Sequence, residues 1–151
     1  MLEEYIKPPE NFVASVRNGI NFTVNKGPSP TEKGRLFLTW ILTKVFHASE
    51  DDAENSILDG ANDHGVDAIL EIQGTEMNFF RIIQSKYGKS HSIDAIRAFK
   101  SKIDDLLKQK PNDLPQGRIR DILIQIKSKD WDVEAIYVTD QIIDFKNEDS
   151  F

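Results

Sequence analysis

Three aspartates and a Gln-x-Lys pair are the residues of this sequence best suited to chemistry. Asp59, Asp63 and Asp67 stand four residues apart in the stretch DGANDHGVDAI, which also holds two glycines. Gln84 follows Asp67 by 17 residues, and Lys86 stands two residues later, at the end of the apolar run RIIQSK. Carboxylate and amide oxygens suit Mg²⁺ or Mn²⁺, and a lysine beside them can stabilise developing negative charge.

Three structures compete for the stretch DGANDHGVDAILE. On a helix, the four-residue spacing would stack like charges on one face, and two glycines would weaken that helix further. An EF-hand loop fails because no register supplies its Asp, Gly and Glu positions together. The remaining structure is a glycine-rich turn that brings Asp67 to the start of a strand, with Asp67 and Glu71 on one side of the sheet.

The rest of the pattern predicts a mixture of helices and strands. Residues 66–73 alternate between apolar and polar, and the more buried run 77–86 follows a turn at Gly74, so a hairpin is expected. Helices are expected around 12–17, from a Thr31 cap to about 46, from a Ser49 cap to 59 and over 92–107, with a last strand over 132–140. Residues 118–127 have helical spacing, and their β-branched content leaves a strand as the alternative. This order predicts an α/β or α+β sandwich.

One face of the predicted hairpin would gather the reactive groups. If Asp67 shares the face of Gln84 and Lys86, the cluster contains a carboxylate, an amide oxygen, the Ser85 backbone carbonyl and an ammonium. A metal ion held there could activate a water and polarise a phosphate. Phosphodiester hydrolysis needs those parts, and the absence of cysteine leaves no thiol nucleophile.

Charge is unevenly spread along the chain, whose net charge is −6. Residues 48–76 hold nine acids and no Lys or Arg, whereas residues 81–110 hold eight bases and three acids. An acidic segment beside a basic one could hold a cation next to a polyanion. Two solvated charged faces would give the same pattern. The lack of cysteine and of a long apolar run favours a cytoplasmic protein.

The strings GVDAI and IIQSKY resemble the PD-(D/E)XK nuclease superfamily, in the variant that has Gln-x-Lys in place of Glu-x-Lys, as in Mrr-like restriction endonucleases. The longer pattern, DGxxDxGVD followed by QSKY, is most similar to the N-terminal nuclease-like domain of AIPR abortive phage infection proteins. The resemblance covers roughly residues 31–140. It implies a restriction endonuclease-like fold, which is a mixed β-sheet flanked by α-helices, and a DNA substrate.

The resemblance also implies roles for individual residues. Asp67 would be the metal-binding aspartate, Gln84 stands where the second acidic ligand would be, and Lys86 would be the catalytic lysine. Many relatives add a glutamate from the first core helix, for which Glu32 is the best candidate, ahead of Glu54. The departure is Gln84, because a neutral ligand weakens metal affinity.

Further candidates surround this core set. Ser85 would contribute its carbonyl to the metal, and Asp63 would support a second metal or hold the loop. Four residues are candidates for contacts with the DNA backbone: Lys89, His91, Arg97 and Lys100. A solvated helix face explains Arg97 and Lys100 equally well.

The function expected from the sequence is a Mg²⁺-dependent or Mn²⁺-dependent DNA endonuclease domain acting in anti-phage defence. Residues 1–30 would be an extension, and 31–151 the nuclease-like domain, in the N-terminal part of a longer protein with further C-terminal domains. Cutting both strands would favour a homodimer. The alternatives are a catalytically silent nucleic-acid-binding or dimerisation module of the same fold, and a nuclease directed at RNA.

Overall fold

We describe the chain from a computed structural model, in which residues 10–58, 65–74, 76–88, 92–129 and 131–141 are described. The chain divides into an N-terminal unit, Met1–His47, and a C-terminal unit, Ala48–Phe151. Together the described residues form five α-helices and a three-stranded mixed sheet, so the predicted mixed α/β class is confirmed. No helix in these described ranges is long and apolar enough to cross a membrane.

The N-terminal unit contains helices α1 (Glu10–Val24) and α2 (Pro30–Trp40), followed by a π-helical turn over Ile41–Val45. Helix α1 is longer than the predicted 12–17. It continues through Gly19, a residue that is weak in helices and that lies against the Trp40 ring. Helix α2 is capped by Ser29, whose Oγ accepts from the Glu32 N–H at 3.2 Å. The cap is therefore Ser29 and not the predicted Thr31, and the helix begins one residue before Thr31, at Pro30. Proline suits this first position because its missing N–H would have no partner within the helix.

The C-terminal unit begins with the short helix α3 (Glu50–Ser56). The predicted cap is confirmed, because the Ser49 Oγ accepts from the Asp52 N–H at 3.1 Å. The helix ends at Ser56 and not at residue 59, since Ile57 is extended and forms a β-bridge with Ala68. The segment after α3 thus pairs with the start of the first strand.

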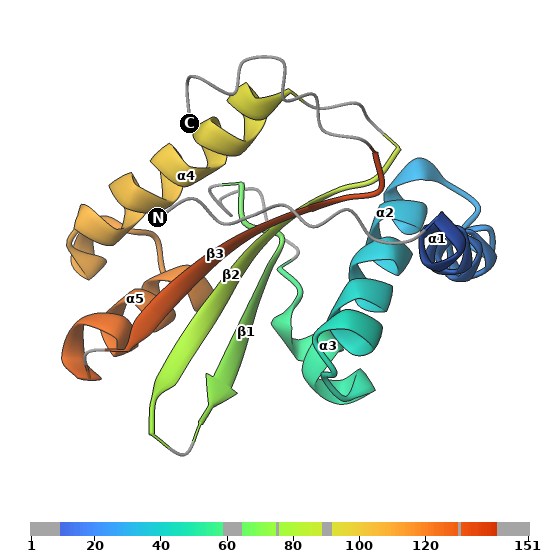
Figure 1. The fold of residues 1–151 in the computed structure, drawn as a ribbon. Helices are drawn as coiled ribbons and strands as arrows, with labels where there is room; N and C mark the ends of the chain where they lie inside the picture. Colours follow the sequence, from blue (N-terminus) through green and yellow to red (C-terminus); the bar gives the residue numbers. More distant parts are fainter. Residues whose placement is uncertain (1–9, 59–64, 75, 89–91, 130, 142–151) are drawn as a thin grey trace. The chain divides into compact units, whose positions relative to one another are not determined.

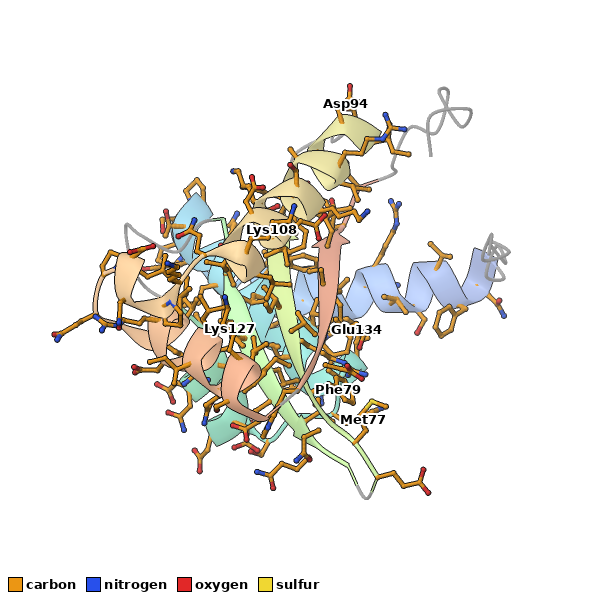
Figure 2. All side chains as sticks on the ribbon, turned by 90° about the vertical axis from the view of Figure 1, so that its left-hand side faces the viewer. Met77, Phe79, Asp94, Lys108, Lys127 and Glu134 are labelled. Atoms are coloured by element: carbon orange, nitrogen blue, oxygen red, sulfur yellow. The ribbon has the colours of Figure 1, made fainter. Side chains whose placement is uncertain are left out.

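The sheet has the order β1-β2-β3, from strands β1 (Ala68–Gln73), β2 (Asn78–Lys86) and β3 (Asp132–Thr139). Strands β1 and β2 are antiparallel, which confirms the predicted hairpin. At the hairpin end, the Met77 side chain is 57% exposed (Figure 2). Strands β2 and β3 are parallel, so the chain must cross over between them.

The crossover consists of helix α4 (Ile93–Lys108), a 3₁₀ turn (Pro111–Asp113) and helix α5 (Arg118–Lys129). Both α-helices lie on one side of the sheet, while α3 lies beside β1 on the other (Figure 1). The core between the sheet and these two helices contains Val66, Ile69, Phe80, Ile82, Phe99, Ile103 and Ile122. The Trp131 ring stacks on Phe80 with centroids 4.5 Å apart and closes the core beside β3.

Candidate functional site

Asp67 stands directly before β1 and is fixed to β2 by two hydrogen bonds. Its N–H donates to the Ile83 carbonyl at 2.8 Å, and its carboxylate Oδ2 accepts from the Ser85 N–H at 2.7 Å. The side chain therefore takes the place of a backbone acceptor where the regular ladder with β2 ends.

Gln84 and Lys86 lie on the face of β2 that is covered by α4 and α5. Side chains alternate along a strand, and Ile82, two residues before Gln84, belongs to the core under these helices. Gln84 is only 9% exposed and pairs with Tyr137 on β3, while Lys86 pairs with Thr139 at the end of the same ladder. The hairpin therefore brings Asp67, Gln84 and Lys86 to the same end of the sheet.

Gly65 forms the turn that leads into Asp67, and it has a φ of 77°. Only glycine adopts this left-handed backbone conformation readily. A Cβ atom at this position would lie 3.4 Å from the Gln84 Nε2 and 3.5 Å from the Lys102 Nζ. Because both nitrogens lie within 3.5 Å of one point, they are at most about 7 Å apart. Lys102, on α4, therefore belongs to the site.

Tyr137, on β3 opposite Gln84, brings a phenol to this end of the sheet. Its hydroxyl oxygen is buried, and its ring lies 6.2 Å from the Phe99 ring of α4. Burial, followed by the negative charge of Asp67, raises the pKa of the Tyr137 phenol above its ordinary value. Tyr137 is thus neutral at physiological pH, and it joins β3 and α4 to the site.

The sequence did not single out Lys102 or Tyr137. On its own, the helix pattern makes Lys102 one of several bases on the solvent side of α4, and the strand pattern makes Tyr137 a core aromatic. The sequence did indicate that one more residue belongs beside Gln84, because any strand that pairs with β2 places a residue opposite it. Which residue that is follows from the β2–β3 register.

The other predicted site residues fall into three groups. Asp63, Lys89 and His91 lie outside the described residues. Glu32 belongs to the N-terminal unit, where it is exposed in the first turn of α2, so its place beside Asp67 stays a prediction.

The third group lies on the basic helix α4. Arg97 is half-buried and forms an ion pair with Asp94, with 3.7 Å between nitrogen and oxygen, while Lys100 is exposed. A contact of either residue with DNA stays a prediction.

The donor set for a metal is one carboxylate with neutral oxygens. Among the residues that the structure describes, no three His, Cys, Asp or Glu side chains are grouped closely enough to hold a metal. The donors at this end of the sheet are the Asp67 carboxylate, the Gln84 amide oxygen and the Ser85 carbonyl. All three are hard oxygen donors, which fits Mg²⁺ or Mn²⁺ and does not fit a thiophilic metal.

A separate polar cleft of about 390 Å³ runs along β1. Its lining consists of Asp52, Asn55, Ser56, Ile69, Leu70, Glu71, Gln73 and Arg118. The Arg118 Nη2 donates to the Ile69 carbonyl at 3.3 Å and so caps part of this strand. Neither Asp67 nor Gln84 lines this cleft, so its shape says nothing about the site at the end of β2.

No protein-family model, no curated protein and no solved structure matches the chain. The function of the site at Asp67 must therefore be argued from its own residues and geometry.

Proposed function

We propose that the chain is a metal-dependent endonuclease domain that hydrolyses phosphodiester bonds of DNA in defence against phage. The observation that carries the proposal is the 2.7 Å hydrogen bond between the Asp67 carboxylate and the Ser85 N–H. This hydrogen bond holds Asp67, the one carboxylate among the proposed metal donors, against the segment Gln84–Lys86. The restriction endonuclease-like fold belongs to the same proposal, supported by a mixed sheet with helices and by the resemblance of the two motifs.

Different residues of the chain would have different roles in this reaction. Asp67, the Gln84 amide oxygen and the Ser85 carbonyl would hold Mg²⁺ or Mn²⁺, which supplies Lewis acidity and a more acidic water when bound. Lys86 would orient the attacking water or offset the charge that develops on the phosphate. Glu32 and Asp63 stay candidates for additional carboxylate ligands.

The test is cleavage of plasmid and phage DNA in Mn²⁺, Mg²⁺ or EDTA. Asp67→Asn and Lys86→Gln should abolish cleavage, because each removes a charge from the proposed site. The matched controls are Asp132→Asn, at the exposed start of β3, and Lys108→Gln, in the last turn of α4. Both controls should cleave like the wild-type chain. Metal-independent cleavage, or full activity of Asp67→Asn, would overturn the proposal.

A second candidate function is a silent nucleic-acid-binding or dimerisation module. It is favoured by the neutral Gln84 and by the absence, within the described ranges, of a group of three acidic or histidine ligands. Thermal unfolding separates the two candidates, since a metal that binds only the folded chain raises its melting temperature by mass action. A silent module gains nothing from Mg²⁺ or Mn²⁺. Competition between matched DNA and RNA duplexes decides the substrate.

The location, the domain context and the oligomeric state of the protein belong to the same proposal. The protein would act in the cytoplasm as part of a longer chain, with further domains helping to hold a long polyanion. A homodimer would place two such sites on the two strands of a duplex. Analytical ultracentrifugation with and without a DNA duplex measures that association directly.

A further inference from the structure

The end of the Lys102 side chain lies against the backbone of Gly65. Its Cδ would lie 3.6 Å, and its Nζ 3.5 Å, from a Cβ atom on Gly65, so the end of the side chain lies across the Gly65 backbone. A lysine stem commonly covers such a surface while its ammonium stays hydrated. Lys102 is an exposed residue of α4.

The surroundings of this ammonium suit an anion. The buried Gln84 amide, whose Nε2 lies within about 7 Å of the Lys102 Nζ, offers N–H donors on one side. The Gln84 amide nitrogen and the Lys102 ammonium both lie around the point where a side chain on Gly65 would begin. Asp67 stands two residues further along the chain, so an anion bound here would lie beside the proposed metal donors.

We infer that Lys102 binds a phosphate oxygen of the DNA backbone next to Gly65, as a cation separate from Lys86. This inference rests on the proposed function, because it names a substrate contact of the same site. Lys86 approaches the site from the end of β2, whereas Lys102 approaches from α4. Two bases from different elements would fix the position of a phosphodiester relative to the Asp67 carboxylate.

Salt dependence of DNA binding tests this contact without cleavage. A fluorescent DNA duplex is titrated in EDTA with the wild-type chain, Lys102→Gln, Lys102→Arg and the control Lys108→Gln, at several salt concentrations. Lys108 lies on the same helix α4 and is labelled in Figure 2. Losing one phosphate contact lowers the slope of log K against log salt by about 0.9 and weakens binding roughly tenfold at low salt.

We expect the smaller slope for Lys102→Gln alone, since Lys102→Arg keeps the charge and Lys108→Gln removes a base six residues further along α4. Circular dichroism and thermal melting verify that all four proteins fold. If Lys102→Gln and Lys108→Gln give the same slope as the wild type, the inference is wrong. A Lys102-dependent slope on RNA but not on DNA also overturns it, because the ligand would then be another polymer.

Cleavage by the same proteins separates this inference from the proposed function. A wild-type chain that cleaves DNA, with an unchanged slope for Lys102→Gln, refutes only the role of Lys102. A wild-type chain that shows the Lys102-dependent slope but never cleaves refutes only the hydrolase. A wild-type chain that binds no DNA refutes both.

Discussion

Asp67 is predicted to have a structural role that can be measured apart from any metal. Replacing it with alanine removes the acceptor of the Ser85 N–H, whose 2.7 Å hydrogen bond ties the turn before β1 to β2. A hydrogen bond to a charged group contributes about 1.5–3 kcal/mol to stability. Both residues are half-buried, so water replaces part of the lost bond. We therefore expect Asp67→Ala to lower the free energy of unfolding by about 1–2 kcal/mol in EDTA.

Asp67→Asn provides the matched comparison. Asparagine keeps a side-chain oxygen that can accept from the Ser85 N–H, and it loses only the charge, which about doubles the strength of such a bond. Asp67→Asn should therefore lower the free energy of unfolding by about half as much as Asp67→Ala. For the C-terminal unit, which spans residues 48–151, the alanine variant should melt roughly 4–8 °C lower than the wild type and the asparagine variant about 2–4 °C lower.

The metal arm of this experiment isolates the ligand role. At a cation concentration of about 100 Kd, a site that binds only the folded chain adds about 2.7 kcal/mol. The wild type should gain this stability in Mn²⁺, whereas neither variant should gain it, because both lack the carboxylate. Differential scanning calorimetry in EDTA and in Mn²⁺ measures both effects on the same samples.

Two results would refute the reasoning about Asp67. Equal stability of all three proteins in EDTA would mean that the Ser85 hydrogen bond contributes nothing. An undiminished gain of Asp67→Asn in Mn²⁺ would mean that the carboxylate is not a ligand.

The remaining predictions concern the turn and the phenol. Gly65→Ala should cost about 1–2 kcal/mol in unfolding free energy because of its φ of 77°, and Gly88→Ala, with a φ of 74° and open space around it, should cost a similar amount. Only Gly65→Ala should also weaken DNA binding, so equal binding by the two variants would contradict the role of Gly65. In the folded chain the pKa of the Tyr137 phenol is raised above its unfolded value near 10.0. The folded chain therefore binds more protons than the unfolded chain, and wild-type stability falls as pH rises above about 10. Tyr137→Phe removes this phenol, so its stability should fall less over the same pH range. Denaturant titrations at pH 8 to 11 in EDTA measure this loss, and parallel curves for the two proteins would contradict it.

The local elements were predictable because their causes are local. The Ser49 cap of α3 and the Gly74 turn of the hairpin follow from a few neighbouring residues, and the structure has both. Helix α1 was predicted too short because Gly19 reads as a helix breaker, whereas its contact with the Trp40 ring depends on another helix. Tertiary packing overrides propensity at such positions.

The composition of the site was predictable only where one hairpin determines it. Asp67 and Gln84 meet because β1 and β2 are joined by a short turn, so alternation and turn length fix their register. Lys102 and Tyr137 come from the long crossover and from the strand after it. Their positions depend on how α4 packs on the sheet and on the parallel register, neither of which the local pattern contains.

The neutral Gln84 alters the charge balance of the proposed site in a particular direction. Asp67 contributes one negative formal charge, while Lys86 and Lys102 each contribute one positive charge, so these residues together attract a phosphate before any cation arrives. A cation held by one carboxylate and two neutral oxygens binds weakly by itself, and substrate phosphate oxygens supply the ligands it lacks. Under the proposed function, DNA and the cation therefore strengthen each other's binding by the same factor. A second carboxylate in place of Gln84 would favour the cation and repel the phosphate, so under the proposed function glutamine would make binding of the cation depend on bound DNA.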